Sequence, residues 1–495
     1  MKTHAKISAE TERGSPLYGG ELPTWEIAEL PAPPPFGMIN LLKTIGPGAI
    51  LLMTAIGGGE WLVGPALGVS YGTHLMWVAT LAIVFQVVFN LEAIRYTLYT
   101  GEPIYTGFLR LKPGPMLWAP LYSFLAVAQL GWPALAASCA GTLFSLIFGR
   151  LPGDHPGDVT IHQWLASGVI LLVLVILLFG GTIERMLEYA SWFMLAFVFL
   201  FLVIVNVFFV PATQWAETLR GFFFIRSAGH NLDWGLMGAL AATAGYGGIG
   251  NLTITSWIRD KGFAMGAQVG AIGSAIGTER IPLSHIGRVF LPTEESLRRW
   301  REWWRYVHAD QVGLWGLFCL IGLFLTVNLA VGVIPSGTDL QGLATGAYQA
   351  EYMARHLWPG FWYLTLLNGY WILFSTHLGN TDLLIRTVTD VLWVSSPRLR
   401  AWGEHRVKVL YYGLLLIFSL WGFIAVRLAG PFALFKILAN VAGLILVISG
   451  VQILIVNRKF LPRELRPSLW REVLLLGCVA FYSFFVFRLL VSAWL

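Results

Sequence analysis

The stretch AILLMTAIGGGEWLVGPALGVS, residues 49–70, decides the fold of this chain. It is apolar and long enough to cross a bilayer, but Gly57–Gly59 interrupt it and Glu60 follows at once. Glycine in a helix interior costs about 1 kcal/mol relative to alanine, so three in a row predict a break in the helix. We expect residues 44–57 and 60–71 to form two half-helices. Because a charged group at membrane depth is costly, Glu60 is a candidate functional residue.

A second apolar stretch is interrupted in the same way. Residues 236–257 read LMGALAATAGYGGIGNLTITSW, with Gly245, Gly247, Gly248 and Gly250 at the centre. Two glycine-interrupted spans in corresponding positions of two halves indicate a transporter site at the bilayer midplane. Irregular backbone at membrane depth is tolerated where it is buried or lines a cavity, so we expect the two breaks to face each other across a central cavity. The alternative is close glycine packing between intact helices.

The composition is that of a helical membrane protein. Of 495 residues, 56% are hydrophobic and only 12% are charged, whereas soluble proteins carry roughly 25% charged residues. We therefore expect an all-α polytopic membrane protein, with membrane lipid as its surroundings. No basic stripe interleaved with aromatic residues stands out, so nucleic acid is not expected as a partner. The three cysteines lie in different apolar spans, which indicates packing rather than disulfides or a metal finger.

Hydropathy predicts eleven membrane spans, at residues 44–71, 74–97, 116–148, 163–180, 186–210, 236–257, 312–334, 361–384, 409–426, 432–456 and 473–491. Residues 1–38 are polar and then proline-rich, and predict a disordered or surface-lying cytoplasmic tail. The segment SLRRWREWWRYVH, residues 296–308, predicts a basic helix lying in the membrane interface.

The charges predict an orientation. If the N-terminus is inside, most of the 33 lysine and arginine residues fall on the cytoplasmic side. The other side then carries Arg150, Arg220, Arg226, Arg355, Arg427 and Arg488. By the positive-inside rule we expect a cytoplasmic N-terminus and, after eleven spans, a C-terminus outside. The expected location is a plasma membrane or bacterial inner membrane.

Several short motifs resemble the Nramp (natural resistance-associated macrophage protein) family of metal transporters. They are Ile45-Gly46-Pro47-Gly48-Ala49, Tyr71-Gly72, Leu75-Met76-Trp77, Glu92-Ala93-Ile94-Arg95 through Thr100-Gly101, Asn251-Leu252 with Ser256, and Leu461-Pro462-Arg463-Glu464-Leu465-Arg466-Pro467. The likeness follows the chain from about residue 40 to the end.

The resemblance implies the LeuT-type fold of the APC superfamily, in which two inverted five-helix repeats are followed by an extra helix. The transmembrane transporter domain would cover residues 39–495. Repeat one would cover about 39–211, repeat two about 234–456, and the eleventh helix about 473–491. The broken spans then fall at the first helix of each repeat.

The metal-site motifs of that family are altered here. Its Asp-Pro-Gly-Asn motif aligns with Gly57-Gly58-Gly59-Glu60, so the Asp is absent and the Asn is a Glu. Its Met-Pro-His motif falls within Gly245 to Gly250, where neither Met nor His occurs. A thioether ligand favours soft transition metals, whereas carboxylates and carbonyls suit harder cations. The resemblance therefore implies the fold and the transport class of this protein more directly than it implies the substrate.

Glu60 could bind a cation as a metal ligand, accept a coupling proton, or only cap the second half-helix, which is favourable by about 0.3–1 kcal/mol. Carbonyls freed around the breaks would add neutral oxygen ligands. The candidate substrate- or ion-binding residues are Gly57, Gly58, Gly59, Glu60, Gly245, Tyr246, Gly247, Gly248, Asn251 and Thr253. Polar lining candidates are Gln86, Gln129, His377 and Asn380, with bonding between helices as the alternative. Asp382 can pair with Arg386 at i,i+4.

The sequence thus predicts a secondary transporter that moves a cation, such as magnesium or manganese, by alternating access. Two alternatives are a carrier of a small organic solute on the same fold and a non-transporting sensor. The sequence shows no nucleophile–base arrangement, phosphate loop or HExxH motif, so we expect no enzyme activity. No cofactor is expected apart from a transported cation, and the oligomeric state is left open.

Overall fold

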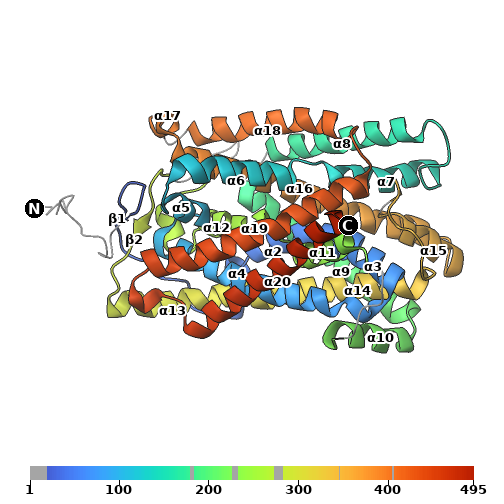
Figure 1. Ribbon diagram of the computed structural model, residues 1–495, viewed down its shortest axis with the longest axis horizontal. Coiled ribbons are helices and arrows are strands. Elements are labelled where there is room, and N and C mark those ends of the chain that lie inside the picture. The colour runs from blue at the N-terminus through green and yellow to red at the C-terminus, as the bar shows by residue number, and fades with distance from the viewer. Residues whose placement is uncertain are drawn as a thin grey trace, which may run out of the picture.

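The computed structural model describes residues 19–178, 183–225, 232–272, 283–344, 346–403 and 406–494. Within these ranges, nine helical segments are long and apolar enough to cross a membrane (Figure 1). They are α2 (Pro47–Ala55) with η1 (Ile56–Val63) and α3 (Gly64–Tyr71); η2 (Thr73–Leu75) with α4 (Trp77–Thr100); α6 (Pro115–Leu130) with α7 (Ala134–Phe148); α8 (Asp158–Leu178); α9 (Ile183–Phe209); α13 (Glu294–His308) with η4 (Ala309–Gly316) and α14 (Leu317–Val333); α18 (Val407–Ala425); α19 (Pro431–Phe460); and α20 (Leu469–Trp494).

Two further segments fill the remaining positions of the predicted series. The sixth consists of two short helices, α11 (Trp234–Thr243) and α12 (Ile249–Lys261), with a gap between them. The eighth is α16 (Phe361–Ser395), which is long but carries many polar residues along its buried length. Every predicted span therefore coincides with a helix in the order expected, and the chain is a multi-pass membrane protein.

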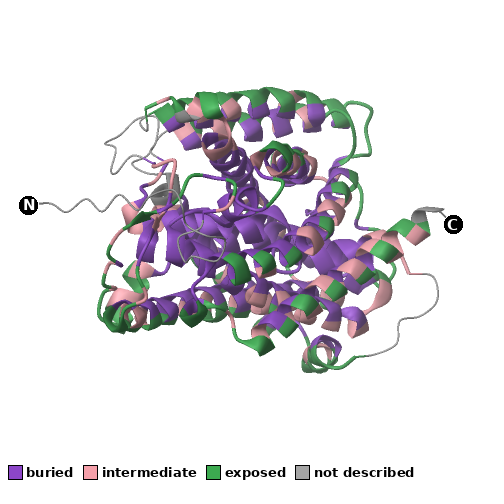
Figure 2. Cartoon of the chain, turned by 60° about the vertical axis from the view of Figure 1, so that its left-hand side comes forward, coloured by how far each residue is buried: buried purple, intermediate pink, exposed green. Residues whose placement is uncertain are grey.

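The buried residues gather in the middle of the molecule (Figure 2), and the first and sixth segments are among them. Every residue of α2 and η1 is buried, and so is every residue of α11 from Leu236 onward. In α8, α18 and α20, by contrast, many large apolar side chains are exposed, as expected for helices that face lipid. α16 packs against α2, η1, α7 and α12 and so joins the two central segments.

Shorter elements lie at the two ends of the helices. Near β1 (Glu26–Ile27) and β2 (Arg288–Val289), at the left of Figure 1, are α5 (Ile104–Leu109) and α17 (Pro397–Arg400). At the right are α10 (Ala212–Phe223) and α15 (Tyr348–His356). The remaining short elements are α1 (Met38–Thr44), η3 (Ala264–Gln268) and η6 (Arg463–Leu465). The segments that the sequence places on one side of the membrane thus lie at the same end of the helices. Which end faces the cytoplasm stays a prediction.

The expectation of a disordered tail is wrong for residues 19–38, and residues 1–18 lie outside the described ranges. β1 pairs in parallel with β2, and Trp25 and Leu30 are buried. Arg110 donates to the carbonyls of Gly19 and Pro23, at 2.7 and 2.8 Å. Burial alone would raise the pKa of Glu102, but the Arg110 guanidinium beside it keeps that pKa below its ordinary value. Long-range contacts therefore order a segment whose composition alone predicts disorder.

The Arg- and Trp-rich segment is helical, but it is not a separate interfacial helix. α13 runs through η4 into α14 as one helical stretch, Glu294–Val333. Its tryptophans Trp300, Trp303 and Trp304 are buried against protein, and Trp303 Nε1 donates to the carbonyl of Pro31 at 2.9 Å. The tryptophans of the predicted interfacial helix thus pack against the N-terminal segment and neighbouring helices.

Candidate functional site

The sixth segment breaks where the sequence predicts it. α11 ends at Thr243 and α12 begins at Ile249, and the residues between them are non-helical. Gly245, Gly247 and Gly248 have φ values of +100°, +87° and +62°. These values lie in the left-handed region that glycine adopts without a steric penalty. The glycines are therefore required for the break, and the predicted non-helical backbone within Gly245–Gly250 is confirmed.

The first segment does not break, and the prediction of two half-helices is wrong. Residues 56–63 form the π-helix η1, which continues α2 directly into α3. The three glycines instead allow neighbouring segments to approach η1 closely. A Cβ on Gly57 would collide with Thr376, and one on Gly58 would lie 2.7 Å from the Phe435 ring. A wide helical turn at a functional position is typical of π-helical insertions.

The two glycine-rich segments nevertheless meet, as predicted. A Cβ on Gly59 would lie 2.9 Å from the backbone nitrogen of Ala244, at the start of the sixth-segment break. The next residue, Glu60, is fully buried, and its Oε1 accepts a hydrogen bond from the Gly245 N–H at 3.2 Å. Its Oε2 has no hydrogen-bond partner among the described residues. A buried carboxylate oxygen without a partner is costly, so this atom needs a proton, a water or an ion.

Two glutamines hold the broken backbone in place. Gln86 donates to the Ala244 carbonyl at 2.9 Å and accepts from the Gly247 N–H at 3.0 Å. Gln129 donates to the Gly247 carbonyl at 3.2 Å and accepts from the Ile249 N–H at 2.9 Å. Backbone groups freed inside a membrane must find partners within the protein. Gln86 and Gln129, predicted as polar lining, therefore bond to the backbone of the break.

The space beside the break is small. Gly58, Gly59, Tyr246 and Asn380 line a cavity of about 10 Å³ for the centre of a water-sized sphere, which is room for about one water. The Tyr246 hydroxyl donates to Oδ1 of Asn380 across it. His377, one turn earlier on α16, is buried and its Nε2 has no partner among the described residues. The central cavity expected from sequence is thus nearly closed.

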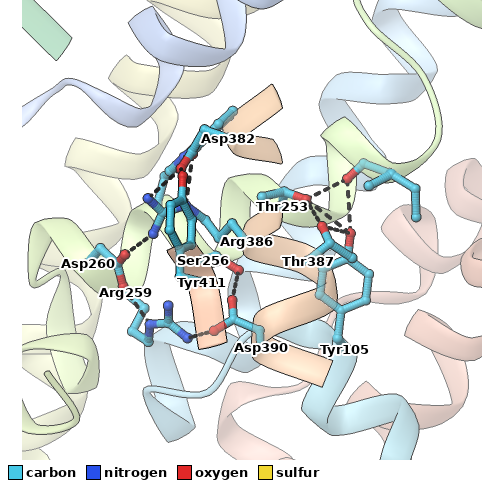
Figure 3. A network of polar contacts seen from close by, with 12 residues as sticks. Tyr105, Thr253, Ser256, Arg259, Asp260, Asp382, Arg386, Thr387, Asp390 and Tyr411 are labelled. Carbon is cyan, nitrogen blue, oxygen red and sulfur yellow. Dashed lines mark hydrogen bonds and ion pairs between the residues drawn. The ribbon is translucent and has the colours of Figure 1, made fainter. Parts of the chain in front are cut away.

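Asn251 and Thr253 bond to groups other than Glu60. Nδ2 of Asn251 donates to Asn90 at 2.8 Å, and the side chain of Asn90 donates in turn to Gln311 at 3.0 Å. Thr253 contacts the hydroxyls of Tyr105 and Thr387, at 3.0 and 2.8 Å (Figure 3). Both residues therefore belong to polar contacts farther along α12.

A buried cluster of charges joins α12 to α16 (Figure 3). The predicted pair is confirmed, because Arg386 contacts Asp382 at 2.9 Å. Arg386 also contacts Asp260, and Arg259 bridges Asp260 and Asp390 at 2.7 Å each. Sequence reasoning missed Arg259, Asp260 and Asp390, because the ion pairs between α12 and α16 join residues more than a hundred positions apart in the chain. We call these five residues the charge cluster.

Two more residues beside the break were missed. The Cys319 thiol, on α14, donates to the Gly245 carbonyl at 3.6 Å. The Trp315 ring, on η4, is buried where a Cβ on Gly245 would lie 3.3 Å from it. Both residues stand among apolar neighbours in the sequence, so the sequence pattern did not distinguish them. No group of three or more His, Cys, Asp and Glu suited to a metal occurs among the described residues.

No family model matches the chain. An uncharacterised protein of Pasteurella multocida (strain Pm70) is 27% identical over 108 residues, which are 22% of this chain and 25% of that protein. The chain therefore matches only a quarter of the length of that relative.

Two solved structures of the manganese transporter of Eremococcus coleocola are similar to this one. One is of a mutant and the other is a complex with an aromatic bis-isothiourea substituted compound. Their TM-scores are 0.61 and 0.59, at 13% identity, and each match covers 94% of this chain and 89% of the other. The likeness shows the fold. The protein is an integral membrane protein with the LeuT-type fold.

Proposed function

We propose that the protein is a divergent Nramp-like secondary transporter that moves a cation across the membrane by alternating access. The observation that carries this proposal is the unpartnered Oε2 of Glu60, buried beside the unwound backbone that follows α11. Ionisable groups inside a membrane protein mark ion and proton pathways. Broken helices bring carbonyls and helix ends to a substrate at the midplane. The fold shared with a manganese transporter supports a metal as cargo.

The chemistry of the break favours a divalent cation that is coordinated by oxygen, such as magnesium or manganese. Carboxylate, carbonyl and water ligands suit these ions, and methionine is absent from the break. Glu60 would be the only charged ligand, helped by carbonyls near Gly57 and Gly247. One carboxylate leaves one charge of a divalent ion uncompensated, so the ion would keep several waters, as magnesium does. Asn251 would contribute through its Oδ1, which has no hydrogen-bond partner among the described residues, while its Nδ2 keeps the bond to Asn90.

Loading a hydrated ion requires the break to open. The cavity beside Tyr246 and Asn380 has room for about one water, which is too small for an ion with its water ligands. The bond between Gly245 and Glu60 would separate as the break after α11 moves away from η1, and the bond between Tyr246 and Asn380 would separate as it moves away from α16. Alternating access then consists of opening this junction toward one side at a time.

The test is uptake by proteoliposomes that contain the full-length protein, with Glu60→Gln as the variant. The substitution keeps the shape of the side chain and removes the charge, so we expect loss of uptake and of metal binding. Thermal stability should be unchanged or higher, because a buried carboxylate is replaced by a neutral amide, which costs less to bury. Glu217→Gln, which removes an exposed carboxylate on α10, should leave uptake unchanged.

Magnesium, manganese and small organic solutes are the substrates offered. Metal uptake that survives Glu60→Gln would place the ligands elsewhere. Uptake of an organic solute with no response to any divalent metal would replace the cation with the organic-solute alternative. Ligand binding without any flux would instead favour the sensor.

A further inference from the structure

A pocket rich in arginine and tryptophan lies at the end of the molecule that we predict to face the cytoplasm. Its volume is about 410 Å³, within the range of pockets that hold small ligands. Its charged and aromatic lining comprises Arg95 of α4, Trp300, Arg301, Trp304 and His308 of α13, Glu464 of η6, and Arg466 and Arg471 next to and on α20. We call it the Arg–Trp pocket.

The Arg–Trp pocket carries excess positive charge. The buried carboxylate of Glu92 contacts both Arg95, at 2.7 Å, and Arg471, at 3.1 Å, so two guanidinium groups share one carboxylate. Arg301 and Arg466 are exposed at the rim, and neither is in an ion pair with a carboxylate among the described residues. The four arginines of the pocket are offset by one lining carboxylate, Glu464, and by Glu92, which pairs with Arg95 and Arg471, and this leaves a net charge of +2.

The inner arginines are held in position before any ligand binds. Their guanidinium carbons lie 4.6 Å (Arg95) and 5.6 Å (Arg471) from the centre of the Trp304 ring. Nη2 of Arg471 donates to Nε2 of His308 at 3.0 Å, which leaves the His308 Nδ1–H to donate to the Trp304 carbonyl at 2.8 Å. A planar guanidinium fixed in this way is suited to an oxyanion with several acceptor oxygens, above all a phosphate.

Apolar surface lies directly beside this charge. Leu469, Trp470, Val473 and Leu476 are exposed on the first turns of α20, immediately after the pocket residue Ser468. Arg471 also lies 5.0 Å from the centre of the Trp470 ring. A free phosphate would leave this surface unused, whereas the acyl chains of a lipid would cover it. Basic pockets between membrane helices on the cytoplasmic side bind anionic lipid headgroups.

We propose that the Arg–Trp pocket binds the phosphate headgroup of an anionic phospholipid, with the acyl chains along the start of α20. Arg95 and Arg471 would contact the phosphate, and Arg301 and Arg466 would attract it from the rim. This site is separate from the junction at Glu60 and does not depend on the transported substrate.

The experiment measures lipid binding by the purified full-length protein in neutral detergent. Phosphatidylglycerol or phosphatidylcholine is titrated, and retention is read by native mass spectrometry. The test variant is Arg301→Gln with Arg466→Gln, because both side chains are exposed at the rim. Each basic residue near a membrane surface adds to the affinity for an anionic lipid. The loss of these two arginines should therefore weaken phosphatidylglycerol binding about 30-fold.

The matched control is Arg305→Gln with Arg463→Gln, which removes the same charge from α13 and η6 at exposed positions outside the pocket. It should bind phosphatidylglycerol like the parent protein. Equal binding of phosphatidylcholine, or equal losses in the two double variants, would overturn the proposal. Inorganic phosphate is added as a competitor, and displacement at concentrations comparable to those of the lipid would assign the pocket to a small phosphate instead.

Discussion

Gly59 is the residue at which the two glycine-rich segments meet. A Cβ there would collide with the Thr243 carbonyl and lie 2.9 Å from the Ala244 nitrogen, both of which are backbone atoms. Backbone cannot turn away as a flexible side chain can. The absence of a side chain at this position therefore sets the distance between η1 and the end of α11, and with it the bond between Glu60 and Gly245.

At this scale we predict that Gly59→Ala abolishes uptake in proteoliposomes and lowers the melting temperature in detergent. Gly168→Ala is the control, because Gly168 lies within α8 with no atom within 4 Å of its would-be Cβ. Alanine there should be neutral or stabilising by about 0.5–1 kcal/mol, since it favours the helix. Uptake by Gly59→Ala at the rate of the parent protein would show that this contact does not govern the site.

At the scale of elements, the charge cluster links α12 to α16 through ion pairs. α12 is the second half of the broken segment. Two guanidinium groups and three carboxylates are buried together, and Tyr411 and Trp257 also donate to Asp382, at 2.6 and 3.0 Å. A buried ion pair is weak evidence for stability by itself, but removing one partner leaves the other uncompensated. The cluster therefore makes the separation of α12 from α16 costly.

We accordingly predict that Arg386→Gln destabilises the protein by about 3–5 kcal/mol, because Asp382 and Asp260 lose their shared guanidinium. Arg386→Lys should restore only part of the stability, since an ammonium cannot pair with two groups through a planar fork. Arg355→Gln removes an exposed arginine that pairs with Glu351 and should change little. Thermal unfolding in detergent measures all three variants. Equal effects of Arg386→Gln and Arg355→Gln would contradict this account of the cluster.

The helices were predictable from sequence because lipid requires about 20 apolar residues for each crossing. The break after α11 was also predictable, because a dense group of glycines disfavours a continuous helix, and three of these glycines do take positive φ values. The π-helix at Gly57–Gly59 was not, because composition does not tell whether glycine permits unwinding or close packing. The charge cluster and Cys319 depend on contacts between segments far apart in the chain. Sequence spacing revealed only the local pair of Asp382 and Arg386.

For the whole molecule, we propose the orientation and repeat boundaries that the sequence predicts. Odd numbers of crossings place the two ends of the chain on opposite sides, and β1 and the last turns of α20 do lie at opposite ends of the helices (Figure 1). A reporter that is active only in the cytoplasm should therefore be active at the N-terminus and silent at the C-terminus. An active C-terminal fusion would contradict the predicted orientation.

Because α13 and α14 form one continuous helix, a movement of α14 inside the membrane should also move the N-terminal segment that packs on α13. Its 40 residues span about 60 Å, twice the hydrocarbon thickness. The carbonyls of Leu30, Pro31 and Pro34 accept bonds from α13, so residues 30–34 travel with it. A tilt of α14 by about 10° about its first residue would displace the far end of α13 by about 6 Å, because α13 and η4 together are roughly 35 Å long. A fluorophore at exposed Ala32 could then follow the transport cycle from outside the bilayer, and the buried native cysteines would not compete for the label.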